Sequence, residues 1–259
     1  MDRYDHSRVF VLGGGHQGLS MAAHLALNGE QVTLWNRTQE HIQDIIRTNT
    51  ISCNGLVTGQ AHIARASSNL ADVISDFIMV TVPSNAQQDV ARMLAPYAHR
   101  NMIVVLNPGR TFGAFEFARV LKTCGCTTLP HIAEAQTIVY TCRRGVGNDV
   151  SIYALKHDVE IASLEKDDIM ETIGAIPACI RDHFKPVDSV MRTSLSNVGM
   201  VLHCAPILLN TGWIENDVAR FKYYYDGITQ SVAQFLEKLD DERMRVAERP
   251  AIAGILGSR

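Results

Sequence analysis

The chain has 259 residues, of which 46% are hydrophobic and 20% charged, a balance typical of a globular protein with a large core. Its formal net charge of −3 and its singly scattered lysines and arginines exclude the clustered basic surface that nucleic-acid binding requires. The longest apolar stretch, Val198–Leu209, contains a histidine and a proline and is too short to span a bilayer, so we expect no membrane partner.

The cysteines and the start of the chain indicate the compartment. Six cysteines are spread along the chain without the Cys-x-x-Cys spacing of a zinc site. The polar opening segment, Met1–His6, lacks the pattern of a secretory signal peptide. We therefore expect reduced thiols, no metal site and a cytoplasmic protein.

The first half of the chain alternates apolar, β-rich runs with helical patterns. This predicts an α/β fold with a doubly wound, mostly parallel sheet of the Rossmann type, covered on both faces. The predicted elements, in chain order, are strand Arg8–Leu12, helix His16–Asn28, strand Gln31–Trp35, helix Gln39–Thr48, strand Asp76–Val82, helix Asn85–Ala95, strand Met102–Leu106 and helix Gly113–Thr123. Segment 50–67 is expected to hold two short strands, and two or three more are expected within 127–155.

The second half has a different pattern, because strand signals stop at about Leu164. The predicted helices are Lys166–Ile173, Ser189–Leu202, a segment near Pro206–Leu209, and Gly227–Val246. We therefore predict two domains: a dinucleotide-binding domain over residues 1–180, and a smaller, all-helical substrate and catalytic domain over residues 181–259.

A glycine-rich motif follows the first predicted strand and opens the first predicted helix. The run Gly13-Gly14-Gly15-His16-Gln17-Gly18 has the spacing G-x-G-x-x-G. Gly13 permits the tight turn, Gly15 lets the backbone approach a pyrophosphate, and Gly18 lets the helix pack closely on the strand. The exposed backbone N–H groups at this helix start, including those of His16 and Gln17, are expected to hold the diphosphate of a dinucleotide.

The residues after the second predicted strand decide which dinucleotide binds. A site for NAD usually offers a carboxylate there, which accepts from the ribose 2′-hydroxyl. This chain has Asn36-Arg37-Thr38 instead. Arg37 can pair with a 2′-phosphate, and Asn36 and Thr38 add neutral hydrogen-bond donors. We predict NADP(H), with NAD as the open alternative; a solvated Arg37 at a helix start is the other interpretation.

The ends of the later strands are expected to line the ligand cleft, because ligands sit at the carboxyl ends of parallel strands. Val82 and Pro83 end the central strand, and Thr111 lies in the turn after the next one, so all three are candidate walls for the ribose and nicotinamide. Glu134 and Thr137 come at the end of the strand after that and are candidate substrate contacts. Glu134 suits a substrate ammonium or guanidinium group, and a surface position is the equal alternative.

His203 is the candidate acid–base residue. In the expected helix, Gly199 lies one turn before His203 and leaves space beside the ring. Pro206 removes the hydrogen bond to the Leu202 carbonyl and bends the chain at that turn. A histidine on an apolar, kinked helix of the second domain is expected to face the cofactor cleft. From these residues alone, a hydrogen-bonded core histidine is the other interpretation.

Several segments together resemble the opine (octopine/nopaline) dehydrogenase family. They are Asn107–Thr111 and Glu134–Thr137 in the first half, and Ser194–Asn197, His203–Pro206, Leu208–Glu215, Phe221–Thr229 and Asp240–Arg243 in the second. The resemblance covers nearly the whole chain and implies a Rossmann domain joined to a helical domain. It also implies an enzyme that condenses an amino acid with a 2-oxo acid and reduces the product with a nicotinamide cofactor.

By the same resemblance, His203 stands where the family has its catalytic acid and base, and Asn197 is expected to contact substrate. Cys204 follows the histidine where the family commonly has proline. The helical domain is also shorter than usual, since the sequence runs Met244–Arg259 and stops. We therefore expect the family's carboxylate partner for the histidine to fall beyond this sequence, so that the chain is either a truncated form or a short variant that uses another carboxylate. Asp226 is a candidate substitute.

Two alternative functions stay open. One is another two-domain reductase, of the ketopantoate or glycerol-phosphate type, which uses a lysine as its key catalytic group. Lys185 and Lys222 are the only lysines between Lys166 and Lys238, and neither lies in such a motif. The other is a catalytically inactive NADP-binding sensor, which the short C-terminus favours. Homodimerisation through an exposed helical face is a further expectation.

Overall fold

The computed structural model describes residues 8–216 and 220–249. The polar opening segment, residues 217–219 and the end of the chain from 250 onward lie outside the described residues. The chain divides into two compact units, Met1–Ser194 and Leu195–Arg259.

The first unit is built on an eight-stranded sheet with the order β12-β11-β8-β7-β6-β1-β2-β5. Its strands are β1 (Val9–Leu12), β2 (Val32–Trp35), β5 (Arg65–Ser67), β6 (Phe77–Val80), β7 (Ile103–Leu106), β8 (His131–Ala135), β11 (Val159–Ser163) and β12 (Phe184–Pro186). Every neighbouring pair is parallel except β8 with β11. The prediction of a mostly parallel, Rossmann-like sheet is confirmed.

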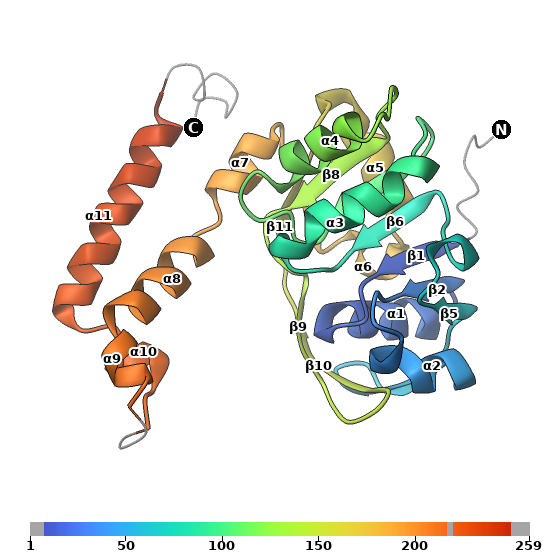
Figure 1. The fold of residues 1–259 in the computed structure, drawn as a ribbon, viewed down its shortest axis with the longest axis horizontal. Helices are drawn as coiled ribbons and strands as arrows, with labels where there is room; N and C mark the ends of the chain where they lie inside the picture. The colour runs from blue at the N-terminus through green and yellow to red at the C-terminus, as the bar shows by residue number, and fades with distance from the viewer. Residues whose placement is uncertain (1–7, 217–219, 250–259) are drawn as a thin grey trace. The chain divides into compact units, whose positions relative to one another are not determined.

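Both faces of this sheet are buried, which explains why its central strands are continuously apolar. Successive residues of a strand point to opposite faces. Val9 and Val11 accordingly join a core with α1 (His16–Leu27), whereas Phe10 and Leu12 join a second core with α3 (Ser84–Leu94) and α4 (Gly113–Thr123). Figure 1 shows α3 and α4 side by side over one face of the sheet.

A second, four-stranded sheet with the order β4-β3-β10-β9 packs against α1. Its strands are β3 (Thr50–Gly55), β4 (Gly59–His62), β9 (Tyr140–Arg144) and β10 (Asp149–Leu155). Segment 50–67 therefore holds three strands rather than the two predicted, because β5 leaves this sheet and pairs with β2. Periodicity along a single strand cannot show which strand it pairs with, so the second sheet was not foreseeable from the sequence.

The remaining helices of the first unit are short. They are a 3-10 turn at Gln39–Ile42 leading into α2 (Gln43–Thr48), further 3-10 turns at Leu70–Asp72, Ala95–Tyr97 and Lys166–Asp168, then α5 (Ile169–Ala175) and α6 (Ala178–Arg181). The strand pattern also resumes once after residue 164, at β12, which pairs in parallel with β11. This pairing keeps residues 184–186 in the first unit, so the division of the structure lies later in the chain than the expected boundary after residue 180.

The second unit is helical. The predicted helix Ser189–Leu202 is interrupted: α7 (Val190–Leu195) falls almost wholly in the first unit, whereas α8 (Gly199–Leu209) lies in the second. There α9 (Thr211–Ile214), α10 (Tyr223–Asp226) and α11 (Gln230–Ala247) follow. A small core joins α8 to α11 through Val201, Ala205, Val232 and Leu236. Among the described residues, no helix combines the length and the apolar character that crossing a membrane would need.

Candidate dinucleotide site and catalytic histidine

The glycine-rich motif forms the turn between β1 and α1, and two of its glycines are required by packing. Gly13 has φ +125°, and a Cβ there would lie 2.8 Å from Thr81 Oγ1. A Cβ at Gly18 would lie 1.6 Å from the carbonyl oxygen of Gly13. Thr81 fixes the turn from β6, because its hydroxyl donates to the carbonyl of Leu12 at 3.1 Å. The turn is therefore built from close backbone contacts that side chains would disrupt.

The start of α1 fits a diphosphate group. Gly15 is its N-cap residue and carries no side-chain cap, and the first turn contains no acidic residue. A Cβ at Gly15 would meet nothing within 4 Å, so the backbone faces open space at this one position of the motif. Unpaired N–H groups and the positive end of the helix dipole at such a site favour an anion.

His16 and Gln17, in the first turn of α1, are both held by the second sheet. The Nδ1 atom of His16 accepts from the backbone N–H of Arg144 at 2.8 Å, which leaves the proton of a neutral ring on Nε2. The side-chain amide of Gln17 donates to the carbonyl of Tyr140 at 3.3 Å. Strand β9 thus orients both side chains.

The end of β2 carries an exposed cation, Arg37, and no carboxylate. Asn36 is used internally, since its Oδ1 accepts from the N–H of Gly14 at 3.0 Å and its Nδ2 donates to the carbonyl of Thr38. The side chain of Arg37 is 68% exposed and meets Asp89 at 3.4 Å. Arg92 also pairs with Asp89, at 2.7 Å, and so neutralises the same carboxylate. Because exposed pairs are weak, Arg37 remains available to an anionic ligand.

The ends of β6 and β7 place a buried amide beside the expected cleft. Val82 is half-buried and Pro83 is exposed at the start of α3. The hydroxyl of Thr111 is directed at the carbonyl of Ser194 at 3.5 Å. Asn107, directly after β7, is 1% exposed, and its amide oxygen and nitrogen both lack a partner among the described residues. Buried polar groups are seldom left unpaired, so Asn107 is a candidate ligand contact, although in the sequence it stands out only as part of a turn.

Glu134 is a structural carboxylate in this structure, which corrects the expectation that it contacts a substrate cation. The residue is fully buried on β8. Its Oε1 accepts from the hydroxyls of Thr193 and Ser194, both at 2.6 Å, and its Oε2 accepts from the N–H of Ala114 at 2.9 Å. Burial raises the pKa of Glu134, and these hydrogen bonds oppose that shift. Its role here is to join β8 to the start of α4 and to α7.

Thr137 lies beside Lys156, whose charge interacts with that of Arg110. The ammonium of Lys156, just after β10, donates to the Thr137 hydroxyl at 3.1 Å. Burial lowers the pKa of Lys156, and the charge of Arg110 lowers it further. Positive charge therefore lies next to Thr137, which is predicted from the sequence to contact substrate. Lys156 gave no signal in the sequence, because a single lysine after a strand is ordinarily a surface residue.

His203 lies exposed on α8 with both ring nitrogens engaged. Its Nδ1 is 2.7 Å from the carbonyl oxygen of Gly199. A carbonyl can only accept, so Nδ1 carries the proton and Nε2 of the neutral ring is the basic atom. The hydroxyl of Tyr224 lies 3.3 Å from that Nε2. A backbone carbonyl one turn away, rather than a carboxylate, therefore fixes the tautomer and direction of this ring.

Pro206 shapes the same turn of α8, as the sequence indicates. A proline has no N–H, so the carbonyl of Leu202 lacks its helical partner. The hydroxyl of Tyr223 takes that position, at 2.9 Å from the Leu202 oxygen and 2.6 Å from the His203 oxygen. Asp226, the candidate carboxylate, instead accepts from the N–H of Lys222 at 2.8 Å. Asn197 is buried in the short link before α8.

The described residues contain no group of three or more histidine, cysteine or acidic side chains suited to a metal ion. All six cysteines are free.

Comparisons with known proteins agree with this geometry. A family model for the α-helical domain of NAD/NADP octopine/nopaline dehydrogenase matches residues 186–255. A model for ketopantoate reductase PanE/ApbA matches residues 9–109, which lie wholly in the first unit. The opine dehydrogenase of Arthrobacter sp. (strain 1C) is 33% identical over 244 residues, which cover 92% of this chain and 66% of that protein.

Solved structures show the same fold. Octopine dehydrogenase with NADH and L-arginine superposes with a TM-score of 0.75 at 17% identity, covering 93% of this chain and 63% of that one. Yersinopine dehydrogenase with bound NADP+ gives a TM-score of 0.77 at 15% identity, covering 93% and 64%. The chain thus spans slightly less than two thirds of the length of these relatives. The resemblance inferred from the motifs is confirmed: this chain belongs to the opine (octopine/nopaline) dehydrogenase family of NAD(P)-dependent oxidoreductases.

Proposed function

We propose that this chain is an NADP-dependent opine-type dehydrogenase, which joins the amino group of an amino acid to a 2-oxo acid and reduces the resulting imine to a secondary amine. The observation that carries the proposal is His203: its Nδ1–H is held by Gly199, its Nε2 is left basic, and it lies in the segment that matches the octopine/nopaline model. The two solved relatives hold NADH with L-arginine in one case and NADP+ in the other.

The first unit supplies the cofactor site. The N–H groups at Gly15 and at the start of α1 hold the diphosphate, and Arg37 pairs with the 2′-phosphate. Val82, Pro83 and Asn107 face the ribose and nicotinamide end. The nicotinamide, when bound, supplies the hydride that reduces the imine carbon.

His203 supplies and removes protons. A neutral ring with an unprotonated Nε2 takes a proton from the substrate ammonium, so that the amine becomes nucleophilic. The same ring returns a proton as the substrate carbonyl oxygen leaves as water. Tyr224 keeps the orientation of the ring between these steps, since its hydroxyl can donate to Nε2 of the neutral ring or accept from Nε2–H of the protonated one.

Both substrates of an opine-type reaction carry a carboxylate, and Lys156, which donates to Thr137, suits one of them. Lys156 offers positive charge, which that of Arg110 reinforces, and the hydroxyl of Thr137 adds a donor. Glu134 does not take part, because its oxygens are occupied and buried. Selectivity for the amine substrate therefore rests on residues other than Glu134.

The test is a matrix of amino acids against pyruvate and 2-oxoglutarate, followed by the absorbance of NADPH and by the mass of the product. We expect oxidation that requires both substrates, and a loss of at least a hundredfold in kcat for His203→Ala with NADPH binding retained. NADPH binding without turnover of any pair contradicts the proposal and supports an NADP-binding sensor. Turnover of a keto acid alone favours a ketopantoate-type reductase instead.

A further inference from the structure

Arg144, the last residue of β9, reaches from the second sheet to the glycine-rich turn. Its Nη1 donates to the carbonyl of Gly14 at 2.9 Å, across 130 positions of sequence. Its Nη2 donates to the carbonyl of Gly147 at 2.9 Å and to that of His41. Its own backbone N–H donates to Nδ1 of His16. One residue therefore contacts both the turn and the first residue of α1.

These bonds fix the directions of two successive peptide planes, Gly13–Gly14 through its N–H and Gly14–Gly15 through its carbonyl. The N–H of Gly14 is held by Asn36 and its carbonyl by Arg144. In a planar trans peptide, the carbonyl of one residue and the N–H of the next point in opposite directions. Holding the Gly14 carbonyl toward Arg144 therefore turns the Gly15 N–H away from Arg144. Gly15 is the motif position whose Cβ direction is open.

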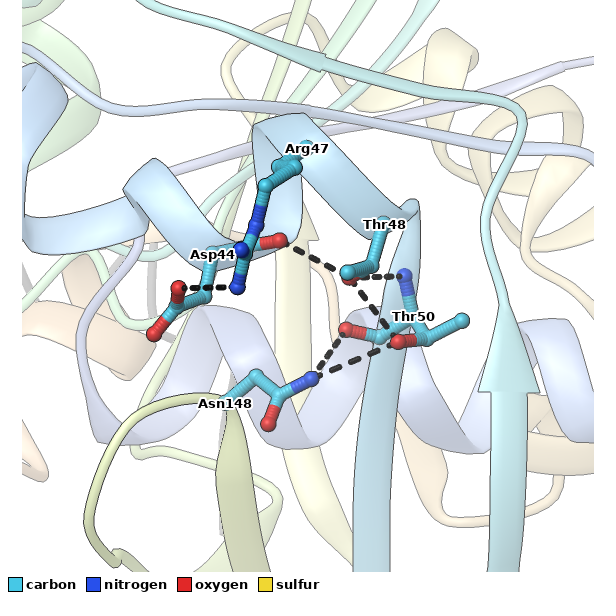
Figure 2. Close-up of polar contacts among 5 residues, drawn as sticks. All are labelled: Asp44, Arg47, Thr48, Thr50 and Asn148. Atoms are coloured by element: carbon cyan, nitrogen blue, oxygen red, sulfur yellow. Dashed lines mark hydrogen bonds and ion pairs between the residues drawn. The ribbon is translucent and has the colours of Figure 1, made fainter.

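The loop that follows Arg144 is itself anchored, so the arginine is not on a loose tip. Figure 2 shows Asn148 beside the junction of α2 and β3, where its Nδ2 donates to the carbonyl of Thr50 at 2.9 Å. The N–H of Ser52 donates back to the Asn148 carbonyl at 3.1 Å. Thr48 joins the same cluster through the Thr50 hydroxyl at 2.9 Å. The turn after Arg144 is thus fixed at one end by strand β9 and at the other by the bonds of Asn148 to β3.

The guanidinium has carbonyl partners on several sides and carries its charge into a partly buried position. Burial lowers the pKa of Arg144, yet an arginine remains protonated at neutral pH. A cavity of about 300 Å³ lies beside it, lined by residues 40–45, Arg144 and Gly147. A side chain smaller than arginine fits at this position without a steric clash.

We propose that Arg144 is a positioning residue for the dinucleotide: by holding the Gly14 carbonyl and His16, it aims the Gly15 N–H and the start of α1 at the diphosphate. This inference rests on the proposed function of the first unit as an NADP(H) site. A planar fork is needed for the role, because three carbonyls are bonded at once; a lysine is a point donor and cannot reproduce this geometry.

The test compares Arg144→Met and Arg144→Lys with Arg143→Ala. Arg143 is the adjacent, exposed arginine of β9, and its side chain donates to the carbonyl of the neighbouring Cys142 at 3.3 Å. For each variant, the dissociation constant for NADPH is measured by fluorescence and the melting temperature is measured without cofactor. We expect Arg144→Met to weaken NADPH binding by about tenfold to a hundredfold, Arg144→Lys to be intermediate, and Arg143→Ala to match the wild type.

The outcomes separate this inference from the proposed function. Wild-type protein and Arg143→Ala that both fail to bind NADPH overturn the cofactor site itself and this inference with it. Normal binding in those two proteins, together with binding by Arg144→Met within twofold of them, overturns the positioning role alone. If Arg144→Met lowers the melting temperature, Arg144→Lys carries the test, and added guanidinium ion at low millimolar concentration should restore binding in Arg144→Met. A failure of this rescue, combined with wild-type affinity in Arg144→Lys, also overturns it.

Discussion

The hydroxyl of Tyr223 lies 2.9 Å from the carbonyl oxygen of Leu202, the oxygen that Pro206 leaves without a helical donor. A side chain from α10 thereby completes the backbone bonding of α8 one residue from the catalytic candidate. This link explains why a proline is tolerated inside the helix: the released acceptor has a partner.

Tyr223→Phe and Pro206→Ala should therefore be coupled. Tyr223→Phe alone should lower the free energy of unfolding of the second unit by about 1 kcal/mol, since it leaves the acceptor unpaired. With Pro206→Ala present, the new N–H supplies the bond, and the same tyrosine change should cost about half as much or less. A double-mutant cycle by urea denaturation measures the coupling, and strictly additive effects would contradict it.

Tyr224→Phe should lower kcat by about fivefold, because it removes the hydroxyl beside Nε2 of His203, a bond of about 1 kcal/mol. NADPH binding should not change, because Tyr224 belongs to the helical unit. Tyr225→Phe is the matched control: it removes a hydroxyl from the neighbouring residue, which is 88% exposed. Equal losses of activity in both variants would remove Tyr224 from the mechanism.

Gly15→Ala and Gly18→Ala should separate ligand binding from folding. A Cβ at Gly15 meets open space, so the variant should melt at the wild-type temperature and bind NADPH at least tenfold more weakly. A Cβ at Gly18 meets a backbone oxygen at 1.6 Å, so that variant should lose about 3 kcal/mol of stability. Thermal melting and fluorescence titration test the pair. Wild-type NADPH affinity in Gly15→Ala would show that no diphosphate approaches there.

Arg37→Ala should weaken NADPH binding by about tenfold and leave NADH binding nearly unchanged, because only NADPH carries the 2′-phosphate. Arg92→Ala is the matched control, as Arg92 shares Asp89 with Arg37 but lies on α3 rather than at the end of β2. Fluorescence titration with both cofactors gives the ratio. An equal loss for NADH and NADPH would contradict the assignment of the 2′-phosphate to Arg37.

Glu134 should give the protein a measurable pH dependence of stability. Its pKa is raised in the folded chain, so between the ordinary glutamate value of 4.5 and the raised value the folded state holds more protons than the unfolded state. Stability from this group is full below pH 4.5 and falls as the pH rises through the raised pKa. Glu134→Gln removes that slope, and urea denaturation at a series of pH values should show the difference. Parallel curves for the two proteins would contradict it.

Local chemistry was sufficient for the cofactor motif and the alternating strands and helices. The spacing of Gly13, Gly15 and Gly18 is recognised within a few residues of sequence, and a buried parallel strand is apolar on both faces whatever lies next to it. The release of the Leu202 carbonyl by Pro206 is equally local. These features follow from short stretches of sequence, and the structure places them as the pattern predicts.

The sequence by itself thus determined the Rossmann-like order of the first unit, its family and the motif at the start of α1. Only the tertiary structure decided that Glu134 is buried rather than open to substrate, that β12 belongs to the main sheet, and that Arg144 holds the Gly14 carbonyl. Each of these depends on contacts between residues far apart in the chain, such as the 130 positions between Gly14 and Arg144. Periodicity and motif spacing describe near neighbours along the chain; burial and hydrogen-bond partners are set by how distant segments pack.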